Sequence, residues 1–207
     1  LLVVVIVAGA AGISSGIGVM KGIIDSAPDI SKIDVTPTGY STTVLAANGE
    51  ETATLVGQGA NRQYVTIDEI PLDLQHAFVA IEDERFYDHN GIDLHGIGRA
   101  FISGLSKGRF SEGASTITQQ LIKNNVLTSW TSETSFVEKL QRKIQEQYLA
   151  LELEKQVNDK DWILENYMNS VNLGANTLGV QAASKKYFNK DVSELTLSEA
   201  SVIAGIT

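Results

Sequence analysis

The chain has 207 residues, of which 43% are hydrophobic, and its 16 basic and 25 acidic residues give a formal net charge of −9. This acidic balance argues against a nucleic-acid-binding protein, which would carry a basic face. The absence of cysteine excludes disulfides and cysteine-based metal sites, while the length allows a membrane anchor followed by one domain with a sizeable core.

An uncharged segment opens the chain, and Lys21 is its first charged residue. A helix needs about 20 apolar residues to cross the hydrocarbon core of a bilayer, whereas the apolar part of a signal peptide has about 7–15. We therefore expect a transmembrane anchor over residues 1–24, with a cleaved signal or a buried helix as the alternatives. Because the chain begins with Leu1 rather than methionine, we expect its natural start, and the basic flank that sets orientation, to precede this residue.

A linker with a small β-hairpin is expected over residues 25–65. Prolines, glycines and hydroxyl residues interrupt regular structure in its first half. Asn48-Gly49 then lies between two β-prone runs, and this dipeptide favours a tight turn because both residues accept positive φ. The predicted strands cover residues 42–47 and 50–56.

From residue 66 onward the hydrophobic pattern is helical, which predicts a mostly α domain over residues 66–207. Its first helix should end near Glu82, with Pro71 in the first turn, and should bury a face made of Ile70, Leu74, Phe78 and Ile81. A second helix is expected over residues 94–106, and a third should begin at residue 115 or 116. A fourth should run from the capping box of Ser135 and Glu138 to about Lys155, and a fifth should follow a cap at Asn158. The sixth should cover residues 178–188, and the seventh should begin at the capping box of Thr196 and Glu199.

Glu82 is the first candidate for chemistry. It follows the apolar run of residues 78–81, so its carboxyl should be partly desolvated, which suits a general base. The alternative is a solvated acid at a helix end, paired with Arg85.

Glu146 is the second candidate, at the entry to a helix half that is apolar on both sides and should therefore be buried all round. An unpaired buried charge is very costly, so Arg142 and Lys143, one turn earlier, are the expected partners. The alternative is an ion pair with a purely structural role.

The third candidate is the start of the helix near residue 115. Ser115 and Thr116 stand at a helix N-terminus, where free N–H groups donate hydrogen bonds to anionic oxygen, and Gln119 and Lys123 share a face beyond them. An ordinary capped helix is the alternative. Two acids beside a cation-bearing helix start favour glycosyl transfer from a phosphate-linked donor, because a departing diphosphate needs cations or a metal rather than a proton.

Five motifs follow one another in the order of a known family. The chain resembles the peptidoglycan glycosyltransferase domain of class A penicillin-binding proteins and monofunctional transglycosylases, glycosyltransferase family 51. The motifs are EDERFYDHNGID (82–93), GASTITQQLIKN (113–124), RKIQEQYLALELE (142–154), ILENYMNSVNLG (163–174) and GVQAASKKYFNKDVSELTLSEASVIAG (179–205). The connection between the second and third motifs is longer than usual, and Lys139 is its only basic residue.

The resemblance implies a lysozyme-like helical fold with a membrane-facing lobe. It implies polymerisation of lipid II into β-1,4-linked glycan strands by inverting transfer from an undecaprenyl-diphosphate-linked donor. Glu82 would be the catalytic base that deprotonates the acceptor 4-hydroxyl, and Glu146 would help to hold the diphosphate or its metal. Lys123 would contact the diphosphate, and the remaining cleft residues would be Arg85, Ser115, Gln119 and Arg142.

The resemblance also implies partners and a location. The enzyme would be a single-pass protein of the cell membrane with its catalytic domain on the extracytoplasmic face. Its partners would be lipid II, the growing lipid-linked strand, moenomycin-type inhibitors and the cell-wall synthesis machinery. It leaves open a divalent cation, Mg²⁺ or Mn²⁺. Residues 97–110 mix apolar and basic side chains, which suits an anionic lipid surface, with a core-packed helix as the alternative.

Two other functions are open to this sequence. A lysozyme-like or lytic glycosidase would not need the basic helix over residues 115–123, and a non-catalytic anchored module would not need both glutamates. The chain has no Ser-x-x-Lys, so it holds no acylation site of that type. We expect the glycosyltransferase domain to continue past Thr207.

Overall fold

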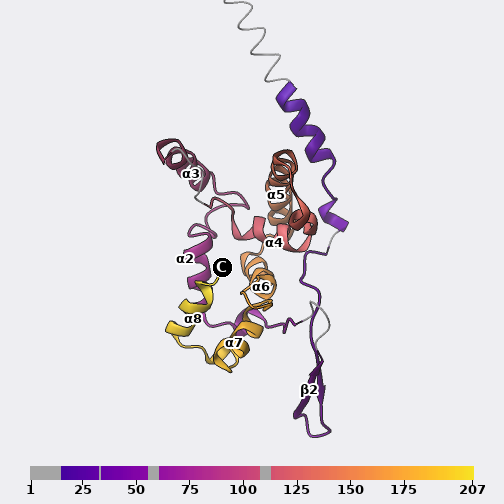
Figure 1. The fold of residues 1–207 in the computed structure, drawn as a ribbon, viewed down its shortest axis with the longest axis vertical. Coiled ribbons are helices and arrows are strands. Elements are labelled where there is room, and N and C mark those ends of the chain that lie inside the picture. The colour runs from indigo at the N-terminus through magenta and orange to yellow at the C-terminus, as the bar shows by residue number, and fades with distance from the viewer. Residues whose placement is uncertain (1–14, 33, 56–60, 108–112) are drawn as a thin grey trace, which may run out of the picture.

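The computed structural model describes residues 15–32, 34–55, 61–107 and 113–207 (Figure 1). In these ranges the chain is mostly helical with one two-stranded antiparallel sheet, which confirms that part of the predicted fold class. After a helix over residues 15–25, the elements are η1 (Ile30–Lys32), β1 (Thr42–Leu45), β2 (Glu51–Leu55), η2 (Ile67–Glu69), α2 (Leu72–Glu82), α3 (Leu94–Lys107), α4 (Ile117–Asn125), η3 (Thr128–Ser132), α5 (Phe136–Val157), α6 (Lys160–Ser170), α7 (Val180–Phe188), η4 (Val192–Glu194) and α8 (Leu197–Ala204).

The predicted anchor over residues 1–24 lies largely outside the described ranges, which begin at residue 15. Its described part is helical and exposes the side chains of Ile17, Val19 and Met20. Among the helices that the structure describes, none is both long enough and apolar enough to pass through a bilayer.

The predicted hairpin is present and projects from the helical body (Figure 1). Thr42 pairs with Leu55 at its base, and a bulge follows Val44. Gly49 adopts φ +84° in the turn, where a residue without Cβ avoids strain. The first strand ends at residue 45 instead of 47, and the predicted end of the second, residue 56, lies outside the described residues.

Hydrogen bonds attach the end of the linker to α6. Val65 N donates to Asn169 Oδ1 at 3.0 Å, and Asn169 Nδ2 donates back to Val65 O at 2.8 Å. Ile67 N donates to Glu165 Oε2 at 2.6 Å. These bonds fix where the chain enters α2.

Helix α4 lies at the centre of the helical body, packed against α5 and α6, while α2 packs against α8 (Figure 1). The largest fully buried side chains come from these elements and their connections: Tyr167, Phe78, Phe86, Leu74, Ile117, Leu121, Ile122, Leu149, Ile163, Leu164, Met168 and Leu173.

The first predicted helix begins later than expected. Residues Ile67–Glu69 form a 3₁₀ turn, and Pro71 is the N-cap of α2 rather than a residue of its first turn. The other residues of the predicted face are buried, but Ile81 is 54% exposed. The prediction for Ile81 was wrong because the last turn of α2 leaves the core and borders a pocket beside Glu82.

The cap assigned to Asn158 was also wrong. Asn158 adopts a left-handed conformation, with φ 49°, and terminates α5, whereas the side chain of Asp159 caps α6 by accepting from Trp162 N at 3.0 Å. Asparagine serves either end of a helix, so composition alone left the boundary open. Helix α7 begins at Val180 rather than at residue 178, while both predicted capping boxes are present.

Helix α5 is not buried all round. In the half of the helix after Glu146, Leu149, Ala150 and Leu153 are buried, but Leu151 is 43% exposed. The prediction failed because an apolar residue on a helix can also face solvent. One face of α5 therefore packs on the core, and Glu146 lies on that face, 1% exposed.

Candidate active site

Glu82 is the last residue of α2, and a side chain of α4 holds its carboxylate. Gln120 Nε2 donates to Glu82 Oε2 at 2.6 Å. At Asp83 the backbone leaves helical geometry, with φ −160° and ψ 74°, so no further helical turn covers the carboxylate. Glu82 is half-buried, which leaves it accessible to a proton donor in solution.

A pocket opens beside Glu82, between the end of α2, the loop that follows it and the approach to α4. Three of the predicted site residues, Glu82, Arg85 and Ser115, line it together. The other lining residues are Ala80, Ile81, Asp83, Glu84, Asp93, Gly96, Arg99, Gly113, Ala114 and Thr116.

Arg85 does not pair with Glu82, so the alternative of a simple helix-end ion pair is wrong. Its Nη2 and Nε bind Asp93 Oδ2 and Oδ1 at 2.5 and 3.3 Å, and its Nη1 binds Glu84 Oε1 at 2.5 Å. The hydrogen bond from Arg85 lowers the pKa of Asp93 from 3.8 to about 2. The guanidinium of Arg85 is therefore bound to other carboxylates and not to Glu82.

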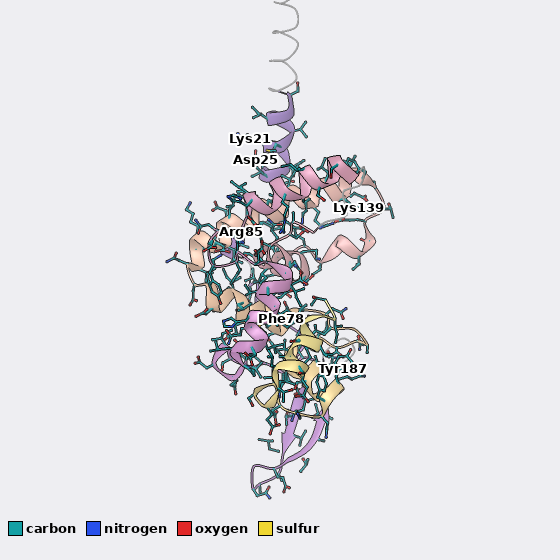
Figure 2. The ribbon with its side chains drawn as sticks, turned by 90° about the vertical axis from the view of Figure 1, so that its left-hand side faces the viewer. Lys21, Asp25, Phe78, Arg85, Lys139 and Tyr187 are labelled. Carbon is teal, nitrogen blue, oxygen red and sulfur yellow. The ribbon has the colours of Figure 1, made fainter. Side chains whose placement is uncertain are left out.

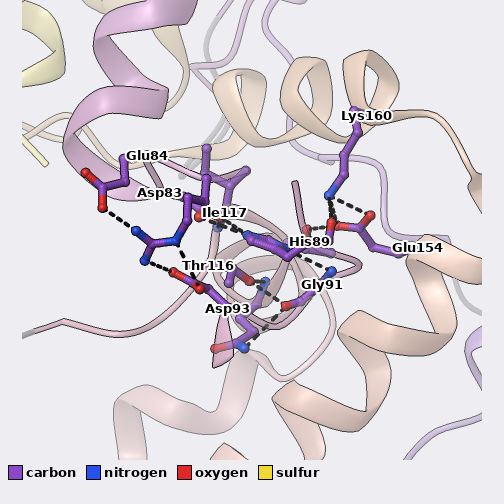
Figure 3. Close-up of polar contacts among 12 residues, drawn as sticks. Asp83, Glu84, His89, Gly91, Asp93, Thr116, Ile117, Glu154 and Lys160 are labelled. Atoms are coloured by element: carbon purple, nitrogen blue, oxygen red, sulfur yellow. Dashed lines mark hydrogen bonds and ion pairs between the residues drawn. The ribbon is translucent and has the colours of Figure 1, made fainter. Parts of the chain in front are cut away.

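The loop after α2 is fixed to the start of α4 through Asp83 (Figure 3). The buried Asp83 carboxylate accepts from Ile117 N at 3.1 Å and from His89 Nε2 at 2.9 Å. His89 Nδ1 accepts from Gly91 N at 3.2 Å, which places the ring proton on Nε2. This network holds the end of α2 and the start of α4 in one arrangement.

Gly91 completes that arrangement. It adopts φ +87°, and a Cβ there would lie 2.7 Å from Ala150 O, so only glycine fits. Its carbonyl accepts from Thr116 Oγ1 at 2.7 Å and from Gln119 Nε2 at 3.4 Å. Gln119 is 1% exposed and lies behind the start of α4, outside the lining of the Glu82 pocket.

A second charged bridge supports the same loop from α5 and α6 (Figure 3). Lys160 Nζ donates to His89 O at 2.6 Å and to Glu154 Oε1 at 2.8 Å. Thr118 Oγ1 also donates to Glu154 Oε1, at 2.6 Å. The loop is thus held by residues from three helices.

Glu146 has the partners that its burial requires. Arg142 Nη1 binds one carboxylate oxygen, and Lys143 Nζ binds the other at 2.9 Å. Arg142 Nε also donates to both oxygens of Glu133, at 2.8 and 2.9 Å. The predicted pairing is confirmed, while Arg142 lines a separate pocket with Glu133 and not the pocket beside Glu82.

Lys143 joins this cation cluster to the Glu82 pocket. Its Nζ donates to Ser115 Oγ at 2.5 Å, and Ser115 lines the pocket. The start of α4 therefore lies between the two carboxylates, where Thr116 caps the helix and Asp83 accepts from Ile117 N; the anion site predicted there stays a prediction.

Lys123 lies within reach of the charges of both glutamates. Burial lowers its pKa, the carboxylates of Glu146 and Glu82 act to raise it, and Lys143 and Arg142 act to lower it further. Its half-buried ammonium thus belongs to the same electrostatic cluster.

Sequence reasoning missed three residues of this region. Gln120 was passed over although its neighbour Gln119 was chosen, because helical spacing from Lys123 favours Gln119. Lys143 was considered only as a partner for Glu146, and Asp83 received no role. The adjacent Arg142-Lys143 pair, one turn before a buried acid, was the signal for a cation cluster.

The arrangement suits proton removal beside an anion site. In the described ranges, no group of three or more His, Asp or Glu side chains could hold a metal ion, and Glu146 already binds two cationic side chains. The described residues therefore do not make a dedicated metal site, and the positive charge near the pocket comes from lysine and arginine.

Comparisons with known proteins agree with this geometry. A family described as "Transglycosylase" matches residues 48–207, beginning inside the predicted linker. The chain is 42% identical over 202 residues to penicillin-binding protein 1A of Clostridium botulinum, covering 95% of this chain and 23% of that protein. It is 44% identical over 166 residues to penicillin-binding protein 1F of Bacillus subtilis, covering 80% and 22%.

A third relative gives a similar result. Penicillin-binding protein 1A of Escherichia coli K12 is 41% identical over 197 residues, covering 94% of this chain and 22% of that protein. The chain thus spans less than a quarter of the length of these relatives.

Proposed function

Since the chain belongs to the transglycosylase family, we propose that its helical domain polymerises lipid II into peptidoglycan glycan strands. The observation that carries this proposal is a half-buried carboxylate, Glu82, in a pocket whose wall at Ser115 is bound by a lysine of the Glu146 cation cluster. Such a pocket pairs a proton acceptor with an anion site.

The chemical step uses Glu82 as general base. Glu82 takes the proton from the 4-hydroxyl of the acceptor sugar as that oxygen attacks the anomeric carbon of the donor. The new β-1,4 bond forms on the face opposite to the departing undecaprenyl diphosphate, whose C–O bond breaks, so the configuration inverts. Gln120 holds one oxygen of Glu82, and the pocket beside it leaves room for the incoming hydroxyl to reach the carboxylate.

The cation cluster stabilises the charge that develops on the diphosphate. Lys123, Lys143 and Arg142 supply positive charge in a partly desolvated place, where it acts more strongly than in water. Glu146 is too deeply buried to make extensive contact with the substrate, so its role is to hold the side chains of Arg142 and Lys143 in position. Leaving-group stabilisation by this cluster distinguishes a transferase from a glycosidase, whose leaving oxygen needs a proton.

The remaining predicted residues shape the site. Arg85 and Ser115 line the pocket and are placed to contact the sugar or phosphate groups of the substrate. Gln119 supports the start of α4 from behind through Gly91. The divalent cation that the family resemblance left open is assigned no step.

The enzyme is further proposed to work at the outer face of the cytoplasmic membrane, with residues 1–24 as a single-pass anchor and a lysozyme-like domain above it. Helix α3 exposes Leu94 (77%) and Ile102 (69%) beside Arg99, which suits contact with anionic lipid. The end of the predicted lipid surface, residues 108–110, lies outside the described ranges. Growing glycan strands, moenomycin-type inhibitors and other cell-wall proteins are the proposed partners.

The test is polymerisation of lipid II by the protein reconstituted in vesicles, with and without moenomycin. We expect lipid-linked glycan polymers that moenomycin suppresses. Cleavage of preformed peptidoglycan without any polymer formation would contradict the proposal and favour a glycosidase.

A further inference from the structure

Three helices contribute to a chain of side chains that ends at Glu82. Tyr167 on α6 donates its hydroxyl to Gln120 Oε1 at 3.3 Å, and Gln120 on α4 donates from Nε2 to Glu82 Oε2 at 2.6 Å. The chain runs from the fully buried Tyr167 through the half-buried Gln120 to the pocket carboxylate. It therefore connects the core to the proposed base.

Glu82 needs such a support because its position gives it little other restraint. It ends α2, so no following turn packs against its side chain. The C-terminus of a helix carries partial negative charge, which disfavours a carboxylate there. The nearest arginine, Arg85, binds Asp93 and Glu84 instead. A hydrogen-bond donor from another helix offsets these effects.

The orientation of the Gln120 amide is set from both ends. An ionised carboxylate only accepts hydrogen bonds, so the NH₂ group must face Glu82 and the amide oxygen must face away. A hydroxyl donor at Tyr167 satisfies that oxygen and opposes a flip of the amide. The amide can therefore present a donor, and not an acceptor, to Glu82.

Tyr167 is well held for this task. Its ring lies edge-to-face against Phe78, with centroids 6.0 Å apart and an interplanar angle of 81°. Phe78 lies one turn before Glu82 on α2, so the same helix carries both the ring's support and the carboxylate. Burial, and next the charge of Glu82, raise the pKa of Tyr167, so the phenol keeps its proton.

We propose that Tyr167 and Gln120 are positioning residues that fix one oxygen of Glu82 and leave the other to take the acceptor's proton. The inference rests on the proposed function, in which Glu82 is the general base. Neither residue touches the reacting atoms, and Tyr167 acts only through Gln120.

The experiment compares lipid II polymerisation by the vesicle-bound protein and its Tyr167→Phe, Gln120→Leu, double and Glu82→Gln variants. Gln120→Leu should lower kcat about 10–100-fold, the effect of losing a hydrogen bond to a charged group, and Tyr167→Phe about 3–10-fold. KM for lipid II should stay within about twofold, because substrate contacts remain. The double variant should be no worse than Gln120→Leu, because Tyr167 acts through that residue.

Matched controls separate this role from a structural one. Tyr187→Phe removes a phenol hydrogen bond to Leu173 O, 2.6 Å long, in a part of the helical body remote from Arg85 (Figure 2), and its kcat should stay within about twofold of wild type. Thermal unfolding of every variant shows whether it folds, and Gln120→Met replaces Gln120→Leu if the latter does not. In the Glu82→Gln background, Tyr167→Phe should have no further effect on the residual rate.

The outcomes distinguish the inference from the proposed function. Independent, additive losses in the double variant would overturn the positioning role and leave the proposed function intact. Wild-type kcat in Tyr167→Phe and in the folded Gln120 variant, while Glu82→Gln is inactive, would do the same. Wild-type kcat in Glu82→Gln would overturn both.

Discussion

The two glutamates of this site are held in opposite ways. Glu82 ends α2, is half-buried, and accepts a hydrogen bond from the neutral amide of Gln120 at 2.6 Å. Glu146 lies within α5, is 1% exposed, and binds Arg142 and Lys143. Two cations already bind the oxygens of Glu146, whereas Glu82 borders an open pocket. The contrast supports the proposal that Glu82 carries out the chemistry and that Glu146 places positive charge.

The structural supports of the two carboxylates differ in the same way. Glu82 depends on contacts from other helices, through Gln120 and the Asp83 network. The two bonds of Glu146 come from its own helix, one turn earlier. A change at Glu146 should therefore disturb stability and anion binding together, and a change at Glu82 should disturb turnover alone.

The largest expected effect is on turnover and comes from removing the proposed base, Glu82. Glu82→Gln should keep the fold and lower kcat by at least about 10²-fold, because a general base contributes about 10²–10⁴-fold. The measurement is the initial rate of lipid II polymerisation. The control is Asp73→Asn, which removes an exposed carboxylate from the other end of α2 and should keep the wild-type rate. Near-normal turnover in Glu82→Gln would contradict the role of Glu82 as general base.

The next effect tests the cation side. Lys123→Ala should raise KM and lower kcat together, by about 10–100-fold in kcat/KM, because in the proposed mechanism the lysine contacts the diphosphate both in the bound donor and as it departs. Lys123→Arg keeps the charge in a different shape and should retain partial activity. A loss in Lys123→Ala confined to kcat would argue against donor binding by this residue.

The same lysine gives a pH dependence with a defined sign. Since burial lowers the pKa of Lys123, it should lose its charge at lower pH than an ordinary lysine. The polymerisation rate of the wild-type protein should therefore fall as the pH becomes alkaline. The rate of Lys123→Arg should fall only at a higher pH, because the charge of arginine persists there. An identical alkaline limb in both proteins would show that another group controls it.

A smaller expected effect is a difference in stability between variants of the two glutamates. Glu146→Gln should lower the free energy of unfolding by about 1–3 kcal/mol, because Arg142 and Lys143 lose their buried counter-charge but can still reach solvent. Glu82→Gln should change it by less than about 0.5 kcal/mol. Urea unfolding of both variants measures the difference, and equal losses would mean that the two carboxylates are supported alike.

The smallest effect concerns the loop that carries Arg85. Because the pKa of Asp93 is lowered from 3.8 to about 2, its pairing stabilises the fold fully above pH 3.8, and this contribution is lost as pH falls toward 2. Asp93→Asn should be less stable than wild type by about 1–2 kcal/mol at pH 6. The difference in the free energy of unfolding between the two proteins should become smaller at about pH 3. A difference that does not change with pH would mean that the loss of stability comes from packing.

Much of this architecture follows from local sequence patterns. The hairpin was predictable because Asn48-Gly49 tolerates a turn that few residues accept, and the capping boxes at Ser135 and Thr196 marked helix starts correctly. Asn158 was misassigned because its short amide suits either end of a helix. Ile81 was misassigned because periodicity finds an apolar face but does not show where the core ends.

The site was only partly predictable for the same reason. Glu146 and its partners lie within one turn of each other, so spacing on a helix found them. Gln120 and Tyr167 reach Glu82 from helices 38 and 85 residues later in the chain (120 − 82 and 167 − 82), and no local pattern reports such a contact. Lys143 was found as a partner of Glu146, but its bond to Ser115 depends on how α5 packs beside α4.

Moenomycin binding to the Glu82→Gln variant tests the division between the two carboxylates most directly. If the diphosphate site is built by the cations around Glu146, the phosphate of the inhibitor should bind there without help from Glu82. Isothermal titration should then give Glu82→Gln an affinity within about threefold of wild type, while Lys123→Ala binds at least about tenfold more weakly. A loss in Glu82→Gln as large as that in Lys123→Ala would place Glu82 in the anion site and contradict the account.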